Sequence, residues 1–236
     1  ARQYAADVLG GKIPACKWVK LAVDRQLTDL KTYAGDRSLY VFDENEANRV
    51  CKFIELLTHT KGELAGTRIH LEPWQVFILT TVFGWLRRAD GGRRYRRAYV
   101  EVPRGNGKST LLSGVGLYCL VADREGGAEV YSFATTRDQA KIVFGDAKVM
   151  AERNAPLRNK FGLQVLANAL YVPTSNSTFQ AKSAEGSTLD GLNTHLAIID
   201  ELHAHKTRAV YDVVETSTGK RKNCLLYTSD AADDKA

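Results

Sequence analysis

The sequence AYVEVPRGNGKS, residues 98–109, decides the fold of this 236-residue chain. Its first part, Ala98–Val102, is a β-rich run that predicts a short strand. A glycine-containing loop follows, and the apolar pattern after it predicts a helix from Ser109 to about Asp123. A strand, a glycine loop and a helix in this order are the context that a phosphate-binding loop, or P-loop, requires.

Each residue type in this loop meets a physical demand of phosphate binding. Glycines let backbone N–H groups approach the β- and γ-phosphates, and the helix N-terminus adds positive potential. Lys108 supplies a point charge, and the hydroxyl of Ser109 is placed to bind Mg²⁺. Val102 and Arg104 depart from the usual GxxxxGK[ST] pattern, and the loop taken alone also fits a glycine turn before a helix. The residues predicted to bind ATP here are Gly105, Asn106, Gly107, Lys108, Ser109 and Thr110.

A second motif, Leu196–Glu201 (LAIIDE), ends an apolar run with two carboxylates. The run predicts a central parallel strand, and ligands of open α/β sheets bind beyond the carboxyl ends of such strands. Asp200 is suited to hold Mg²⁺ through water, and Glu201 to orient and deprotonate an attacking water. Alone, the motif is more commonly a solvated acidic strand end. Its place downstream of the P-loop, with a strand and helices between, favours the catalytic interpretation.

A third motif, Leu71–Gln75 (LEPWQ), precedes the loop. The amide of Gln75 can pair with an adenine edge through its donor and acceptor together. Trp74 can stack on the adenine ring. An amphipathic helix start with Trp74 in the core is an equally good interpretation of this segment by itself.

Strands alternate with helices from residue 98 onward, whereas residues 1–70 predict helices. The further elements predicted are an amphipathic helix (74–85, introduced by Pro73), a strand (129–134), a helix (137–153), a hairpin-like pair (163–172 with 178–181) and a strand (196–199). The predicted fold class is α/β: a P-loop NTPase of RecA/ASCE type, with a mainly parallel sheet flanked by helices and preceded by a helical amino-terminal segment.

Composition and charge limit the classes of protein to which the chain can belong. Hydrophobic residues make up 44% and charged residues 25%, which excludes wholesale disorder and a collagen-like or membrane class. No apolar run approaches the roughly 20 residues that span a bilayer, so we expect no membrane association and a cytoplasmic protein. The formal charge of +6 hints at a polyanionic partner. The four cysteines lack zinc-site spacing, and we expect reduced thiols, three of them in the core.

Three segments are expected along the chain: a helical amino-terminal or lid segment (1–70), a truncated P-loop ATPase core (71–223) and a non-native tail (224–236). The tail sequence CLLYTSDAADD is similar to a translated transposon-end adapter used to prepare DNA sequencing libraries. A genuine polar tail is the alternative. Because the chain also starts without methionine, we expect it to be a fragment.

Together the motifs resemble the ATPase domain of the large terminase subunit of tailed bacteriophages, the genome-packaging motor. The resemblance covers most of residues 1–222. It rests on five ordered blocks: LEPWQ (71–75), PRGNGKS (103–109), TTRDQAKIVF (135–144), EGSTLDGLN (185–193) and IDELHAHK (199–206).

The resemblance implies an ATPase half that translocates double-stranded DNA into a procapsid, and a nuclease half that lies outside this chain. It assigns Lys108, Ser109 and Arg104 to phosphates or Mg²⁺, with Arg104 and Lys108 counted as catalytic beside Glu201. Asp200 would hold the metal and Gln75 the adenine. The implied partners are double-stranded DNA, the portal protein, the small terminase subunit and further copies in a homo-oligomeric ring. The implied location is the cytoplasm of a bacterial host.

Two other functions remain open at this point. Asp200–His203 fits the motif of a DExH nucleic-acid helicase, and Gln75 fits a helicase glutamine. Such an enzyme needs a second RecA-like domain, and only 36 residues follow Asp200. A non-hydrolysing nucleotide-binding module is the other alternative.

Arginines supply two further hypotheses. A cluster that precedes the P-loop strand could grip DNA phosphates or form a solvated turn: Arg87, Arg88, Arg93, Arg94, Arg96 and Arg97. Arg137, Arg153 and Arg158 are the candidates for an arginine finger supplied to a neighbouring subunit.

Overall fold

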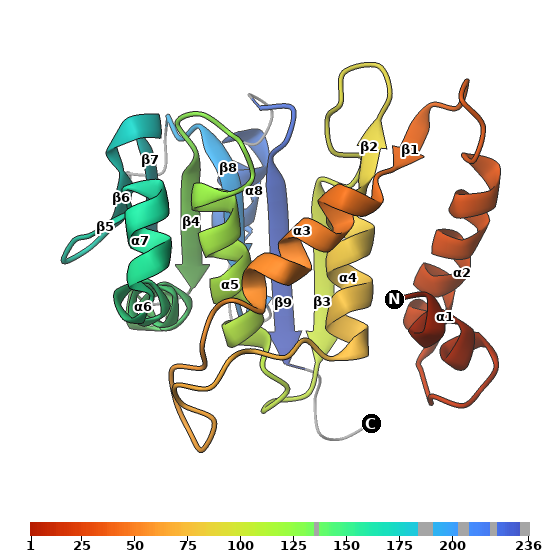
Figure 1. Cartoon of the computed structure of the whole chain (residues 1–236), viewed down its shortest axis with the longest axis horizontal. Helices are drawn as coiled ribbons and strands as arrows, with labels where there is room; N and C mark the ends of the chain where they lie inside the picture. Colours follow the sequence, from red (N-terminus) through yellow and green to blue (C-terminus); the bar gives the residue numbers. More distant parts are fainter. Residues whose placement is uncertain (135–136, 184–190, 203–207, 218–220, 232–236) are drawn as a thin grey trace. The chain divides into compact units, whose positions relative to one another are not determined.

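The computed structural model describes residues 1–134, 137–183, 191–202, 208–217 and 221–231. The chain divides into two compact units (Figure 1). Unit 1 contains residues 1–55 and 70–95, and unit 2 contains residues 56–69 and 96–236. This division differs from the boundary expected at residue 70, because the segment 70–95 packs with the amino-terminal helices.

Unit 1 is mainly helical, as the sequence predicts. Its elements are α1 (Arg2–Leu9), α2 (Lys17–Thr32), β1 (Tyr40–Phe42), α3 (Glu44–Ile54), α4 (Pro73–Gly84) and β2 (Trp85–Arg87). The two short strands, which the sequence does not predict, pair antiparallel with Phe42 opposite Trp85.

Local sequence explains where two helices of unit 1 begin. The carboxylate of Asp43 accepts hydrogen bonds from the backbone N–H groups of Asn45 and Glu46 and so caps α3. Glu72 and Gln75 form a reciprocal capping box at the start of α4, and Pro73 occupies the first turn. The predicted helix over residues 74–85 is therefore present. It is buried on most sides and not amphipathic, because most of its side chains lie in the core of unit 1.

Unit 2 contains one sheet whose strand order is β3-β9-β8-β4-β7-β6-β5 among the described residues. The strands are β3 (Arg97–Val102), β4 (Glu129–Ala134), β5 (Gln164–Val165), β6 (Leu170–Val172), β7 (Ser177–Ser183), β8 (Thr194–Ile199) and β9 (Leu225–Ala231). The first five strands in this order pair in parallel, and β6 and β5 add an antiparallel edge. The expected hairpin-like pair is present as β6 and β7, although the run 163–172 itself folds back between β5 and β6.

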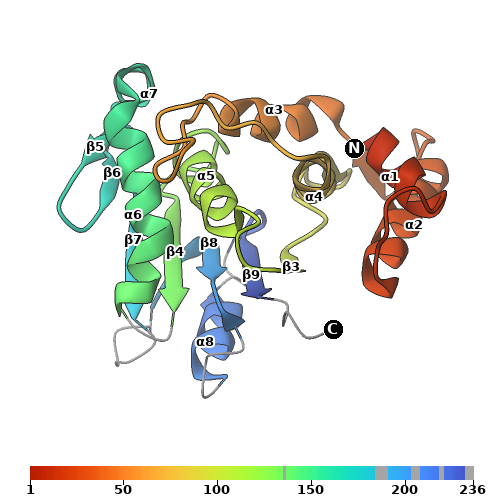
Figure 2. The ribbon, with the colours of Figure 1, turned by 90° about the horizontal axis from the view of Figure 1, so that it is seen from below.

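Helices cover both faces of this sheet, as Figure 2 shows. The helices of unit 2 are α5 (Lys108–Val121), α6 (Arg137–Arg153), α7 (Ala155–Phe161) and α8 (Ala209–Ser217), with a short 3₁₀ turn, η1 (Pro173–Ser175). Alternate strand residues face opposite sides. Tyr131, Phe133 and Ile199 pack against α8. On the opposite face, the hydroxyl of Ser132 donates to the carbonyl of Ala140 in α6.

The sheet confirms a mostly parallel α/β fold of the P-loop ASCE type. Strand β8 is buried at every position and lies between β9 and β4, as its apolar sequence predicts. The helix of the P-loop follows β3 directly, with its N-cap at Gly107.

Strand β9 is an element that the sequence does not predict, and it comes from the segment 224–236 that we expect to be a non-native tail. Residues 225–231 form a parallel strand between β3 and β8. Leu225, Leu226 and Tyr227 are at most 2% exposed, so the apolar start of this segment fills the core. The origin of the segment stays a prediction.

Among the described residues, every helix is too short or too polar to cross a membrane.

The contact between α5 and β7 yields a stability prediction. A Cβ added at Gly116 would lie 2.5 Å from Cε1 of Phe179. Overpacking costs about 1–3 kcal/mol, which exceeds the helix-propensity gain of about 1 kcal/mol for alanine over glycine. We therefore expect Gly116→Ala to lower the free energy of unfolding in urea by about 1 kcal/mol. The control is Gly145→Ala in α6, where a Cβ meets no atom within 4 Å and a gain of about 0.5–1 kcal/mol is expected. Equal effects of the two substitutions would contradict the packing account.

Candidate nucleotide-binding site

The P-loop joins the carboxyl end of β3 to the start of α5. Gly105 and Gly107 adopt φ values of 82° and 72°, in the left-handed region that glycine enters at no steric cost. The side-chain amide of Asn106 donates to the carbonyls of Pro103 and Arg104, at 3.1 and 3.4 Å. Asn106 thus shapes the loop with its side chain. The loop itself is solvent-exposed from Pro103 to Gly107.

Lys108 reaches back along its own loop. Its ammonium donates to the carbonyl of Val102 at 3.0 Å and to the carbonyl of Asp230 in β9 at 2.5 Å. These acceptors hold the positive charge beside the ends of β3 and β9. Ser109 and Thr110 occupy the first turn of α5 and are half-buried.

Asp200 follows the last residue of β8 and lies at the same edge of the sheet. One carboxylate oxygen, Oδ1, accepts from the hydroxyl of Ser229 at 2.5 Å and from the backbone N–H of Glu201 at 3.1 Å. Ser229 and Asp230 are consecutive in β9, so one strand contacts both Asp200 and Lys108. Neighbouring strands are about 4.8 Å apart, which places the ends of β3 and β8 roughly 10 Å from one another.

Glu201 has an unusual backbone. Its φ is 53°, in the left-handed region that residues other than glycine seldom occupy. Such conformations cost of the order of 1–3 kcal/mol and cluster at functional sites. The half-buried side chain leaves the strand in a direction that a regular β conformation would not give.

These placements fit ATP and Mg²⁺ chemically. The loop offers an ammonium, an exposed glycine backbone and a helix N-terminus, which are the groups that cradle phosphates. A serine hydroxyl and a strand-end aspartate are the hard oxygen donors that Mg²⁺ prefers. Arg104 lies on the exposed loop, and within the described part of the chain its side chain makes no hydrogen bond or ion pair.

The two residues predicted to bind adenine belong to unit 1. The side-chain oxygen of Gln75 accepts from the backbone N–H of Glu72 at 3.0 Å, as half of the capping box. Gln75 is 8% exposed and Trp74 is half-buried. Gln75 therefore has a local role in starting α4, and adenine recognition by Gln75 and Trp74 stays a prediction.

Each arginine of the predicted cluster has a neighbour in the structure, but Arg88 and Arg97 are exposed, and DNA binding by the cluster stays a prediction. All six side chains have intramolecular partners. Arg87 forms an ion pair with Asp90, and Arg97 forms one with Glu215. Arg88 donates hydrogen bonds to Ser38 and Gly35, and Arg96 donates to Cys224 and Arg221. Arg93 stacks on the ring of Phe83. Arg94 pairs with Asp29 at 2.9 Å and is enclosed by the rings of Tyr33, Tyr40, Trp85 and Tyr95.

Two of the three arginine-finger candidates are also held locally. Arg153 donates to the carbonyls of His59 and Thr60, and Arg158 to those of Ala151 and Glu152. The side chain of Arg137 lies outside the described residues. The same holds for residues 135–136, 184–190 and 203–207, which include parts of three of the motif blocks, and His203 and His205.

The cysteines match expectation, since Cys51, Cys119 and Cys224 are buried and Cys16 is exposed, all as free thiols. Burial raises the pKa of Cys51 to about 11. The structure adds a cluster that sequence spacing misses: Cys119, Asp123 and His195 converge in unit 2, although 72 residues separate the last two.

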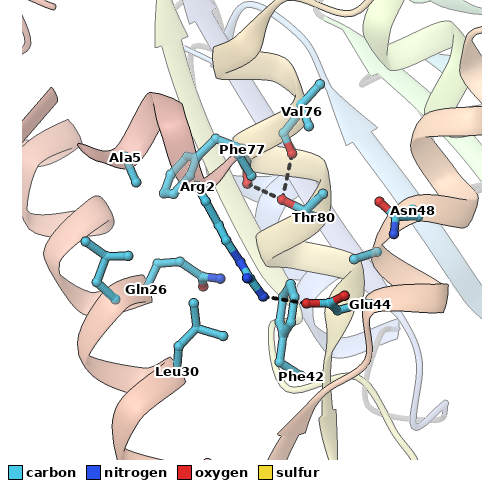
Figure 3. A pocket seen from close by; sticks show the side chains of 13 residues that line it. Arg2, Ala5, Gln26, Leu30, Phe42, Glu44, Asn48, Val76, Phe77 and Thr80 are labelled. Atoms are coloured by element: carbon cyan, nitrogen blue, oxygen red, sulfur yellow. Dashed lines mark hydrogen bonds and ion pairs between the residues drawn. The ribbon is translucent and has the colours of Figure 1, made fainter. Parts of the chain in front are cut away.

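Unit 1 contains a separate cavity of about 260 Å³ (Figure 3). Figure 3 shows Arg2 and Glu44 pairing at this cavity, with Gln26, Phe77 and Thr80 also in its wall. Its volume is below the roughly 300–1,000 Å³ of typical small-molecule sites. None of its lining residues belongs to the predicted nucleotide site.

The sheet order, the glycine loop and the Asp-Glu strand end together define a P-loop ATPase fold of the ASCE class. Residues 73–235 match the family model described as terminase large subunit, ATPase domain. The chain belongs to this family.

A sequence comparison and a structure comparison with one relative illustrate the match. The chain is 31% identical over 192 residues to the terminase large subunit of Enterobacteria phage HK97, an alignment that covers 79% of the chain and 37% of that protein. The crystal structure of the HK97 bacteriophage large terminase superposes with a TM-score of 0.66 and 28% identity, over 78% of this chain and 37% of that one. The chain thus spans little more than a third of the length of this relative.

The strand-end carboxylate provides a test of the site. Asp200→Asn keeps an oxygen that can accept from Ser229 and Glu201 but removes the negative charge. We expect the free energy of unfolding to change by less than about 1 kcal/mol, and the Mg²⁺-dependent part of thermal stabilisation by ATP to disappear. The measurement is the unfolding temperature with ATP and either Mg²⁺ or EDTA. Asp212→Asn, at an exposed position of α8, is the control and should keep the Mg²⁺ effect.

The aromatic enclosure of Arg94 provides a second test. Arg94→Met removes the positive charge that pairs with Asp29 and contacts the four rings. We expect a loss of about 1–3 kcal/mol in the free energy of unfolding. Arg88→Met, at an exposed position of the same segment, should cost less than about 0.5 kcal/mol. Denaturant unfolding measures both, and a silent Arg94→Met would show that the enclosure adds no stability.

Proposed function

We propose that this chain is the ATP-hydrolysing part of a viral DNA-packaging motor and that it drives double-stranded DNA into a procapsid. Family membership supports the class of activity. The observation that carries the proposal is that the P-loop with Lys108 and the strand-end Asp200 lie at the same edge of one mainly parallel sheet. ATP and Mg²⁺ are the proposed nucleotide and metal.

The P-loop binds and orients the phosphates in this proposal. The N–H groups around Gly105 and Gly107 point toward phosphate oxygens, and the N-terminus of α5 favours their charge. The ammonium of Lys108 exchanges its carbonyl acceptors for the β- and γ-phosphates. Arg104 adds a second positive charge from the exposed part of the loop.

Ser109 and the carboxylates of Asp200 and Glu201 have the remaining roles in this proposal. Ser109 and Asp200 hold Mg²⁺, which when bound supplies neutralisation of the charge that develops on the phosphate oxygens. Glu201 orients a water molecule in line with the γ-phosphate and accepts its proton. The hydrogen bond from Ser229 to Asp200 fixes the orientation of that carboxylate.

The wider setting follows from the family of the relatives. Double-stranded DNA, the portal protein and the small terminase subunit are the proposed partners, and the active form is a homo-oligomeric ring in the bacterial cytoplasm. Trp74 and Gln75 are proposed to contact the adenine. The positive charge of the chain is compatible with a DNA partner, but Arg94 is not the proposed contact, because it pairs with Asp29 and is enclosed by aromatic rings.

The test is ATP hydrolysis by residues 1–236, with and without double-stranded DNA. We expect Glu201→Gln to lower the rate by about 10²–10⁴-fold while ATP still raises the unfolding temperature, since only the water-activating group is lost. Lys108→Ala should abolish both hydrolysis and the thermal shift. Lys160→Ala, at an exposed position of α7, is the control and should leave both unchanged.

The contrary outcomes are distinct. Unchanged hydrolysis in Glu201→Gln would remove Glu201 from the proposed role. A folded protein with a nucleotide-induced thermal shift and no hydrolysis, even with DNA, would favour the non-hydrolysing module.

A further inference from the structure

The end of α5 that is remote from the P-loop carries a cluster of three metal-ligating residue types. Cys119 lies in the last turn of α5, and Asp123 follows two residues after the helix ends at Val121. His195 is the second residue of β8. With a rise of 1.5 Å per residue, the helix separates this cluster from Lys108 by roughly 20 Å.

The three side chains are close together and shielded from water. One ligand atom from each lies within 4.8 Å of the other two. Nε2 of His195 is 2.6 Å from Oδ2 of Asp123. The side chain of His195 is fully buried and that of Asp123 is 8% exposed, while Cys119 is 1% exposed.

This contact provides a hydrogen-bond partner for only one of the two ring nitrogens of His195. Nδ1 of His195 is buried and has no hydrogen-bond partner in the described part of the chain. When Nε2 carries the proton toward Asp123, Nδ1 is a bare lone pair in the core. A neutral imidazole nitrogen of this kind is the commonest protein ligand for metals. The proton can sit on either ring nitrogen, and when it is on Nδ1 the Nε2 lone pair that faces Asp123 is free to bind a metal ion.

We propose that Cys119, Asp123 and His195 form a Zn²⁺ site that joins the end of α5 to the start of β8. Thiolate, imidazole and carboxylate are the donors that Zn²⁺ takes. Ligand atoms around a tetrahedral zinc are roughly 3.4–3.6 Å apart, so the observed spacing needs only small movements of the side chains. Asp123, the least buried of the three, leaves a side from which water can supply a fourth ligand.

Binding at this site releases protons and stabilises the folded chain. The thiol of Cys119 would lose its proton to solvent, the imidazole would carry its proton on Nδ1, and Nε2 and the carboxylate of Asp123 would bind the metal. Because the ligands come from an α5 end and a β8 start, the metal ties together the elements that carry Lys108 and Asp200 at their other ends. The site is separate from the nucleotide chemistry and does not depend on the proposed function.

The experiment uses residues 1–236, freed of metal with a chelator and kept reduced without added thiols. Co²⁺ is the spectroscopic probe and Zn²⁺ the competitor. We expect one equivalent of Co²⁺ to produce a thiolate-to-cobalt charge-transfer band, and Zn²⁺ to abolish it. Zn²⁺ at a hundredfold excess over its Kd should raise the unfolding temperature by about 5–10 °C.

Variants test whether the charge-transfer band comes from the cluster of Cys119, Asp123 and His195. Cys119→Ala and His195→Gln should lose it, whereas Cys16→Ala, at the exposed cysteine, should keep it. If the folded wild-type protein shows no band, the proposal is overturned, whether or not the variants fold. A band that survives in Cys119→Ala also overturns it, because the thiolate then belongs to another cysteine.

Discussion

The candidate site depends on parallel pairing of β3 and β8 with one strand between them. Parallel pairing sends the carboxyl ends of both strands to the same edge, where one ends in the P-loop and the other in Asp200. The intervening strand sets both their separation and their register. Through Ser229 and Asp230 it also holds the aspartate and the lysine in defined orientations. Removal of that strand would leave two buried strands with unsatisfied backbone groups, which is a large penalty in a protein core.

Much of this arrangement could be predicted from residue patterns. The strand, loop and helix around Lys108 have local causes: an apolar run, glycines at positive φ and an apolar helical period. The buried face of α6 follows equally from spacing, since Ala140, Val143, Ala147 and Met150 recur at helical intervals and are all buried. Such features depend on neighbours in the sequence, and for that reason sequence alone reveals them.

Features that depend on distant partners could not be predicted in the same way. Beyond its apolar start, the segment 225–231 has no strong strand pattern of its own. It forms a strand because the backbone groups of β3 and β8 pair with it on both sides. The arginines near residue 94 suggest an exposed basic patch, yet Asp29 and four aromatic rings from other elements enclose Arg94. Likewise, no spacing rule brings Cys119 to His195. For Glu201 the sequence predicts a catalytic role, which stays a prediction, but it gives no sign of the left-handed backbone that the structure has there.

We propose that the ends of β3 and β8 form one site for the phosphates of ATP. A crystal structure of this chain with Mg²⁺ and a non-hydrolysable ATP analogue would test this site. We expect Nζ of Lys108 to leave the carbonyls of Val102 and Asp230 for the β- and γ-phosphates, with Mg²⁺ between Ser109 and Asp200. A nucleotide bound elsewhere, with Lys108 still on those carbonyls, would rule the site out.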